Sequence, residues 1–289
     1  MLRKLGFNPE DFHAILTSGE ISHRMLSGDP SLQCETWYVL QQLIAREQTK
    51  AIVLGSGDDD GEYIESAGWT LARDVTEANL IVARGAFTIV DKVTVVSKKQ
   101  SAQVYKEKLD HVLCEAAKLN IPMFICNPDK VRPDEGLPPM PGAIGDAYVE
   151  ALQQHGGLSI SDAQSLVKRI GKPYREMYDL ALSSIEGCTE LAKACTVMVG
   201  DALETDVTGG MEIGCSTVWV VRDGIHGPTV AQLEEKFGEG DSALERSVNS
   251  VVQQFNDAEG FFGSSTKMGQ ENEKKMIVPT FVVPHFRWE

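Results

Sequence analysis

Short apolar runs, each stopped by glycine or by Asn-Pro, alternate along this chain with segments of helical spacing. The runs are KAIVLG (50–55), NLIVARG (79–85), MFICNP (123–128) and VMVG (197–200). Runs of this length suit buried strands, and the helical segments between them can serve as crossover connections. Strands and helices that alternate in this order predict an α/β fold built on parallel sheets.

The segments between these runs supply the remaining expected elements. We expect helices at residues 21–45 (with a turn at 27–30), 62–67, 101–119, 142–155, 161–170 and 171–185. We expect further strands ending at 17–19, around 69–72, at 215–224 and in the apolar tail 277–289. The proline-rich stretch 130–141 predicts a loop, and within the polar, acidic stretch 234–275 the segments 235–242 and 263–275 predict flexible tracts.

Length and charge limit the classes of protein to which this chain can belong. At roughly 100–200 residues per domain, 289 residues suggest two domains. The 27 Lys and Arg residues against 42 Asp and Glu residues give a net charge of -15, which disfavours nucleic acid and anionic membranes as partners. The apolar runs are too short to span a bilayer and no basic-then-apolar leader opens the chain, so we expect a cytoplasmic protein.

Six cysteines are present and none forms a C-x-x-C pair. Several lie in apolar stretches, where a reduced cysteine behaves as a small hydrophobic residue. This pattern argues against a zinc site or a disulfide framework.

The most specific local pattern is VMVGDALETD, in which a β-branched strand runs into Gly200 and Asp201, with Glu204 and Asp206 following. The carboxyl end of a parallel strand is where open α/β sheets bind ligands. Carboxylates that converge there suit Mg²⁺, which takes one or two of them together with waters and phosphate oxygens. The same residues would equally suit a turn that caps the next helix, so spacing alone leaves both interpretations open.

A second pattern lies upstream, where Gly171, Lys172 and Pro173 precede a helical segment. Proline favours the first helical turn, which would place Lys172 at a helix N-terminus. A lysine there opposes the helix dipole, so an anionic partner such as phosphate explains it better than capping does.

These two patterns, in this order, resemble the haloacid dehalogenase-like hydrolases, specifically the large-cap group with NagD-type and p-nitrophenylphosphatase-like enzymes. The resemblance also runs through ILTSGE, KAIVLGSGDDDG, ICNPD, GAIGDAYVE and the closing VVPHFRW, and so covers nearly the whole chain. It implies a Mg²⁺-dependent phosphatase that acts on a small phosphorylated metabolite. It also implies a Rossmann-like core formed by residues 1–48 and 171–289, with an inserted α/β cap at 49–170.

The resemblance also assigns individual residues. Lys172 matches the lysine that steadies the phosphorylated aspartate and is expected to contact substrate. Asp201 and Asp206 match the acidic motif that holds Mg²⁺. Asn127 and Asp129 match the ends of the family's NPD stretch at the cap side of the cleft and are expected to bind substrate.

One departure from the family is chemically important. Members open with a strand ending in D-x-D, which carries the nucleophile, and a second strand ending in Thr or Ser; both are absent ahead of MLRKLGFNPEDF. We therefore expect a truncated chain whose N-terminal core strands are missing, with weak Mg²⁺ binding and negligible phosphatase activity. The exposed strand edges would make the core marginally stable or pair it with another chain, including a homo-oligomer. The alternative is a pseudoenzyme or scaffold of the same fold that binds a phosphate ligand.

Asp58 and Asp60 form a D-x-D that imitates the missing pair. The glycines and serine of GSG separate them from the strand, and the resemblance places them in the cap, so we interpret them as an acidic turn. The same stretch lacks the glycine that a dinucleotide-binding G-x-G-x-x-G would need at Asp60. The six histidines and four tryptophans are expected to be core or surface residues.

Overall fold

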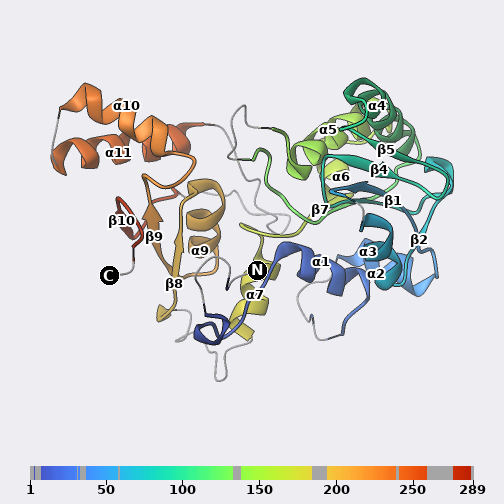
Figure 1. Cartoon of the computed structure of the whole chain (residues 1–289), viewed down its shortest axis with the longest axis horizontal. Coiled ribbons are helices and arrows are strands. Elements are labelled where there is room, and N and C mark those ends of the chain that lie inside the picture. The colour runs from blue at the N-terminus through green and yellow to red at the C-terminus, as the bar shows by residue number, and fades with distance from the viewer. Residues whose placement is uncertain are drawn as a thin grey trace. The chain divides into compact units, whose positions relative to one another are not determined.

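The computed structural model describes Arg3 and residues 8–30, 32, 37–57, 59–132, 138–183, 194–238, 241–258 and 276–287. The chain forms two compact units, Met1–Ser184 and Ile185–Glu289, each built from strands and helices (Figure 1). The predicted α/β class is therefore confirmed. Within the described ranges, no helix combines the length and the apolar character needed to cross a membrane.

The first unit contains a seven-stranded sheet. Its parallel strands are β1 (Lys50–Gly55), β3 (Leu80–Ala83), β6 (Met123–Ile125) and β7 (Val167–Arg169), in that spatial order. The short strand β2 (Thr70–Leu71) pairs in parallel with the first two residues of β1. The runs predicted as buried strands are strands, and β1 is buried from its second residue to its last.

The edge of this sheet beyond β1 departs from the expected parallel pattern. Strands β4 (Thr88–Val90) and β5 (Val95–Ser97) form a hairpin that pairs antiparallel with β1 through β4. The turn between them is closed by Asp91, which accepts hydrogen bonds from the backbone N–H groups of Val93 and Thr94. A turn this short joins antiparallel strands only, because a parallel pair needs a long crossover.

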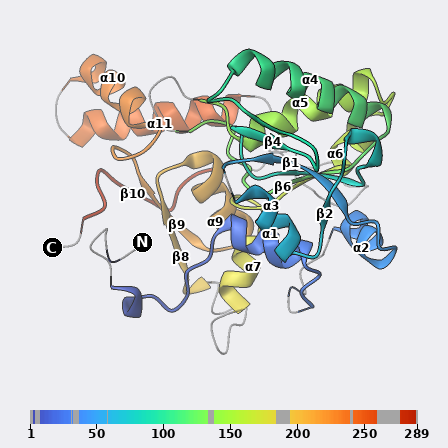
Figure 2. The same ribbon diagram turned by 45° about the vertical axis from the view of Figure 1, so that its right-hand side comes forward.

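Helices cover both faces of the sheet (Figure 2). Alternate β1 residues point to opposite faces: Ile52 and Leu54 pack with α4 (Ala102–Lys118), α5 (Pro141–Gln154) and α6 (Ile160–Ser165). Ala51 and Val53 pack with α1 (Ser18–Leu26), α2 (Tyr38–Ala45) and α3 (Asp60–Ser66). A parallel sheet buried on both faces explains why its strands read as continuous apolar runs rather than as alternating ones.

Two predictions in this unit are wrong. Residues 12–17 form no strand; instead the Thr17 hydroxyl accepts a hydrogen bond from the Glu20 N–H and caps α1. The helix expected over 161–170 ends at Ser165, and Val167 begins β7, which pairs with β6. Tertiary pairing with a buried neighbouring strand outweighs the local helical pattern there.

The second unit contains a three-stranded parallel sheet in the order β10–β9–β8, with β8 at Val197–Gly200, β9 at Ser216–Val220 and β10 at Phe281–Val283. A π-helical turn at Leu203–Val207 leads into α9 (Thr208–Glu212). The core of this unit centres on Trp219, Leu203 and Val230, together with residues of α11 (Asp241–Asp257).

The flexible tract predicted at 235–242 is partly wrong, because α10 (Gly227–Phe237) covers its first three residues and α11 its last two. Val248 and Val251 of α11 are buried in a helix whose other residues are mostly polar, so its average composition conceals an apolar stripe. The tract predicted at 263–275 lies outside the described ranges.

The apolar tail returns to the sheet as predicted, and side chains hold it there. The amide of Asn256 bonds both the N–H and the C=O of Ile277 at 2.8 Å. The hydroxyls of Thr217 and Thr280 each accept the other residue's backbone N–H at 3.0 Å. These contacts place β10 beside β9.

The assignment of residues 1–48 and 171–289 to one core domain stays a prediction. In the first unit, helices α1 and α2 pack on the seven-stranded sheet, and so do Met177 and Leu180 of α7 (Arg175–Ser183).

Candidate functional site

The acidic loop after β8 is organised by Asp206. Its carboxylate accepts hydrogen bonds from the N–H groups of Asp201 (3.1 Å) and Ala202 (3.2 Å), and the residue is only 2% exposed. Gly200, the last residue of β8, makes this possible, because a Cβ there would lie 2.1 Å from the Asp206 carboxyl carbon. The shape of the loop therefore depends on both Gly200 and the buried Asp206.

Asp201 projects from this loop. Its backbone C=O accepts a hydrogen bond from the indole N–H of Trp219 at 3.0 Å. Its carboxylate lies against Gly224, where a Cβ would be 2.3 Å from one carboxylate oxygen. Within the described part of the chain, that carboxylate makes no hydrogen bond or ion pair, so it is available to a ligand.

Glu204, the third carboxylate of the motif, is engaged elsewhere. Its Oε2 lies 3.0 Å from Nε2 of His226, which follows β9 and packs edge-to-face on Trp219 at a ring separation of 5.5 Å. Across the ranges described above, no three His, Cys, Asp or Glu side chains are grouped so as to hold a metal ion. The loop thus offers one outward carboxylate, at Asp201, on a frame held by Asp206.

This loop fits a hard divalent cation in part. Mg²⁺ keeps several waters and takes one or two carboxylates, so Asp201 against the cradle of Gly224 is a suitable ligand. Asp206 serves first as the acceptor that shapes the loop. An ion here would need further oxygen ligands from water or from a bound phosphate.

The other predicted site residues lie in the first unit, at the carboxyl ends of β6 and β7. Asn127 Oδ1 accepts the N–H of Asp129 at 3.0 Å and folds the NPD stretch into a tight turn. Gly171 abuts the same turn, since a Cβ there would lie 2.6 Å from the Pro128 ring. Asn127, Asp129 and Lys172 are thereby brought to one edge of one sheet, because β6 and β7 are neighbours in it.

The expected position of Lys172 at a helix N-terminus is wrong. Helix α7 begins at Arg175, and residues 171–174 form a turn in which the Tyr174 N–H bonds the Gly171 C=O at 2.8 Å. A turn forms here instead of a helix because Gly171 adopts a φ of 128°, a conformation that favours glycine and does not continue into a helix.

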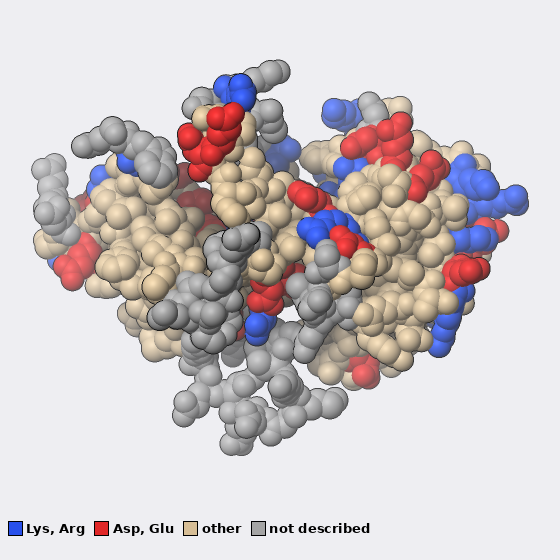
Figure 3. Space-filling view, turned by 90° about the horizontal axis from the view of Figure 1, so that it is seen from below, with Lys and Arg blue, Asp and Glu red and all other residues tan. Residues whose placement is uncertain are grey.

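A charged cluster that sequence reasoning missed lies at the same edge. Asp146 of α5 pairs with Lys130 at 2.7 Å and with Arg169, the last residue of β7, at 2.9 Å. The two ion pairs connect the NPD turn, α5 and the strand that leads to Lys172. Figure 3 shows the wider pattern on one face, where basic and acidic side chains of the described residues lie beside one another.

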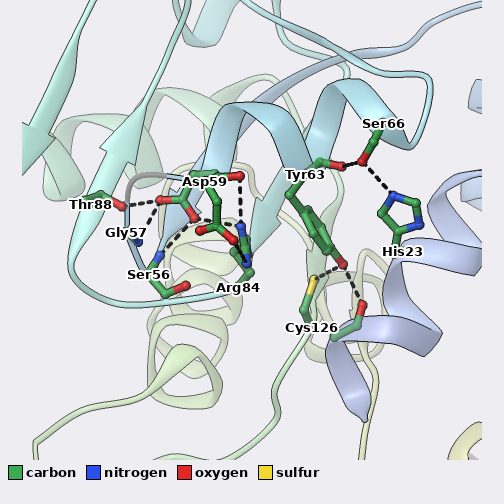
Figure 4. A network of polar contacts seen from close by, with 11 residues as sticks. His23, Ser56, Gly57, Asp59, Tyr63, Ser66, Arg84, Thr88 and Cys126 are labelled. Atoms are coloured by element: carbon green, nitrogen blue, oxygen red, sulfur yellow. Dashed lines mark hydrogen bonds and ion pairs between the residues drawn. The ribbon is translucent and has the colours of Figure 1, made fainter. Parts of the chain in front are cut away.

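The described part of the D-x-D, Asp59 and Asp60, belongs to a structural turn, and Figure 4 shows Ser56, Gly57, Asp59, Arg84 and Thr88 around it. Asp60 is 1% exposed, and its carboxylate accepts the N–H groups of Ser56 and Gly57 and the hydroxyl of Thr88, while Arg84 pairs with it at 3.1 Å. With both oxygens engaged, Asp60 cannot act as an acid or base without dismantling the turn. Asp58 lies outside the described residues.

The same network continues to Tyr63 and Cys126 (Figure 4). Arg84 stacks on the Tyr63 ring at 4.2 Å, and the Tyr63 hydroxyl donates to the C=O of Gly19 at 2.9 Å. Burial raises the pKa of the Cys126 thiol to about 11, which makes it an inert core residue.

Sequence reasoning missed three residues that contact the acidic loop from β9 and the segment after it: Trp219, Gly224 and His226. A signal for them was present: RDGIHG follows a strong strand, and the carboxyl end of each strand in a parallel sheet faces the same edge. Applying to β9 the rule that identified Asp201 after β8 would have selected Gly224 and His226.

Comparisons with known proteins agree with these features. A family model described as HAD-hydrolase-like matches residues 169–245, which include Lys172, Asp201 and Asp206. A dihydroxyacetone phosphatase from Corynebacterium glutamicum (strain R) is 38% identical over 104 residues, which are 35% of this chain and 32% of that protein. The match thus spans about a third of that relative.

A crystal structure of 4-nitrophenylphosphatase from Thermotoga maritima aligns with 98% of this chain and 74% of its own, at 19% sequence identity and a TM-score of 0.50. At 19% identity, this similarity shows a shared fold and no more. By its family match the chain is similar to the haloacid dehalogenase-like hydrolases, and its fold is similar to that of a 4-nitrophenylphosphatase, so the resemblance to this family predicted from the sequence is confirmed.

Proposed function

We propose that this chain carries the phosphate-binding and metal-binding parts of a Mg²⁺-dependent phosphomonoester hydrolase. The observation that carries the proposal is the acidic loop: the HAD-like match covers it, Asp206 holds its backbone, and the Asp201 carboxylate makes no hydrogen bond or ion pair in the described part of the chain. A turn built only to cap a helix would not need an unpaired carboxylate seated against a glycine.

Each predicted residue has a distinct part in this proposal. Asp201 and Asp206 are the acidic pair, with Asp201 as the outward ligand and Asp206 as the residue that shapes the loop. Lys172 contributes positive charge to a phosphoryl group, and Asn127 and Asp129 lie on the substrate side. Mg²⁺ bound at the acidic loop would offset negative charge on the oxygens of a phosphate that binds to that loop.

The substrate class we propose is a small phosphorylated metabolite. The net charge of -15 supports this over nucleic acid, since binding of a polyanion requires a basic surface. The name of the curated relative, a dihydroxyacetone phosphatase, supports a phosphate ester of low mass. Self-association stays a prediction.

We further propose that the 289 residues bind a phosphomonoester without turning it over at ordinary rates. Covalent phosphoryl transfer needs an in-line carboxylate nucleophile. The one D-x-D within this sequence is at 58–60, where Asp60 is committed to a structural turn. The second candidate function is a non-catalytic phosphate-binding protein of the same fold. It rests on the same observation, that the Asp60 carboxylate is bonded within a structural turn.

The first experiment measures p-nitrophenyl phosphate hydrolysis by this chain with and without Mg²⁺, together with phosphate binding by calorimetry. We expect weak phosphate binding and negligible hydrolysis. Turnover between about 1 and 1000 per second would contradict the proposed lack of activity. If Asp58→Asn then removed that turnover, the nucleophile would be Asp58 and the assignment of the turn would be wrong.

The second experiment compares Lys172→Ala with Lys106→Ala, a matched loss of one exposed lysine from α4. Lys172→Ala should abolish phosphate binding, because it removes the cation proposed to face the phosphoryl group. Lys106→Ala should leave it unchanged. Equal affinities in the two variants would show that Lys172 has no part in binding.

A further inference from the structure

We propose that Trp219 is a positioning residue for Asp201, so that the affinity of the acidic loop for Mg²⁺ depends on an indole N–H that never touches the ion. This inference rests on the proposed function, which makes Asp201 the outward metal ligand. The relevant contact is the hydrogen bond of 3.0 Å from Trp219 Nε1 to the Asp201 C=O.

The backbone of Asp201 is held on both of its sides. Its N–H donates to the buried carboxylate of Asp206 at 3.1 Å, and its C=O accepts from Trp219. With both backbone groups of the residue bonded, the direction of its Cα–Cβ bond is set by neighbours rather than by the loop itself. The remaining freedom of the carboxylate is rotation of its own side chain.

Trp219 is itself held firmly. It is 0% exposed in the core of the second unit, at a position in β9 that pairs with Gly200 of β8. His226 packs edge-to-face on its indole, and Glu204 holds His226 at 3.0 Å. The chain of contacts Glu204–His226–Trp219 therefore ends on the carbonyl of the proposed metal ligand.

Gly224 constrains the direction of the Asp201 carboxylate. A Cβ on residue 224 would lie only 2.3 Å from one oxygen of that carboxylate, so the carboxylate occupies a close-fitting cradle. A small rotation of the Asp201 backbone would lift the carboxylate out of that cradle. Residues that orient a metal ligand commonly change metal affinity by about 10–100-fold when they are replaced.

The test is a Mg²⁺ titration followed by the indole N–H resonances of the four tryptophans in uniformly ¹⁵N-labelled protein. In the unmodified chain the Trp219 resonance should shift as Mg²⁺ binds, and the shift should vanish in Asp201→Asn. In Trp219→Phe, which keeps an aromatic ring but removes the donor, Mg²⁺ affinity should fall by about tenfold. Calorimetry supplies the affinity without any assay of activity.

Trp69→Phe is the matched control. Trp69 is also buried, at 1% exposure, and its indole N–H also donates to a backbone carbonyl, that of Leu26, at 2.9 Å. It lies in the first unit, so its loss should leave Mg²⁺ affinity unchanged even if stability falls. A purely structural role for Trp219 would make the two variants behave alike.

The outcomes separate this inference from the proposed function. If the unmodified chain shows no Mg²⁺ binding, or binding that Asp201→Asn retains, the proposed metal site is wrong. If binding requires Asp201 but the Trp219 resonance does not move, or Trp219→Phe binds as tightly as the unmodified chain, the positioning role alone is wrong. The resonance measurement needs no variant at position 219 to fold, because Trp219 can be assigned by replacing the other three tryptophans.

Discussion

Replacing Gly55 with alanine should be among the most damaging single-methyl additions in the first unit. A Cβ at residue 55 would lie 1.8 Å from one Asp60 carboxylate oxygen and 2.5 Å from the Thr88 hydroxyl. Both residues are buried, and Asp60, which carries the charge, is only 1% exposed. The carboxylate must therefore move, and it has no solvent to move into.

The magnitude follows from the contacts that would be lost. The Asp60 carboxylate accepts two backbone N–H groups at 3.1 Å and the Thr88 hydroxyl at 2.6 Å, and it pairs with Arg84. A hydrogen bond to a charged group contributes about 1.5–3 kcal/mol, so losing two of them costs about 3–6 kcal/mol. That is a large share of the roughly 5–15 kcal/mol by which a domain is stable.

The measurement is urea unfolding followed by tryptophan fluorescence, with Trp69 reporting on the core of the first unit. Gly57→Ala is the matched control, because a Cβ at residue 57 meets no atom within 4 Å and its N–H still reaches Asp60. The free energy of unfolding should change by no more than about 1 kcal/mol in that control.

A loss below about 1 kcal/mol in Gly55→Ala, with an unchanged dependence on urea, would refute this reasoning. It would mean that the turn rearranges cheaply and that Asp60 does not hold it. Asp60 would then be free to serve as an acid or base after all, and the interpretation of the D-x-D would have to be revised.

Three further predictions concern other contacts. The hydrogen bond of 2.7 Å between His285 Nδ1 and the Asp223 carboxylate lowers the pKa of Asp223. This contact holds the C-terminal segment at neutral pH and is lost as pH falls through the lowered pKa. Asp223→Asn should therefore speed amide exchange in that segment at pH 7 but not in strong acid. At pH 8 a thiol reagent should modify Cys195, which is exposed, well before Cys126, whose burial holds its pKa at about 11; faster reaction of Cys126 would contradict its burial. Asn256→Ala removes two bonds to the tail backbone and should lower the free energy of unfolding of the second unit by about 1–3 kcal/mol, measured by urea titration.

The sequence predicted the elements whose local pattern and burial agree. The β1 run is apolar because both of its faces are buried, and the acidic loop was found because it follows the short β-branched run of β8, although β8 itself is only half-buried or exposed. Helices α4 and α5 were predicted nearly to their ends, because each carries an apolar stripe at helical spacing.

The failures come from interactions that local patterns do not encode. Strand β7 has only three residues and forms because β6 offers it a pairing edge. Helix α11 was missed because its polar face dominates its composition. Trp219 looked like an ordinary core residue, since the carbonyl that its N–H reaches lies eighteen residues earlier in the chain.

The acidic loop of the second unit and the turn of the first are built on the same plan. In each, a strand ends in glycine, and a buried aspartate a few residues later accepts the first two backbone N–H groups after that glycine. They differ at the residue directly after the glycine, which is Ser56 in one and Asp201 in the other. One backbone arrangement, a strand-ending glycine followed by a buried aspartate that accepts the next two N–H groups, therefore occurs twice in the chain, and only the second copy places a carboxylate directly after the glycine.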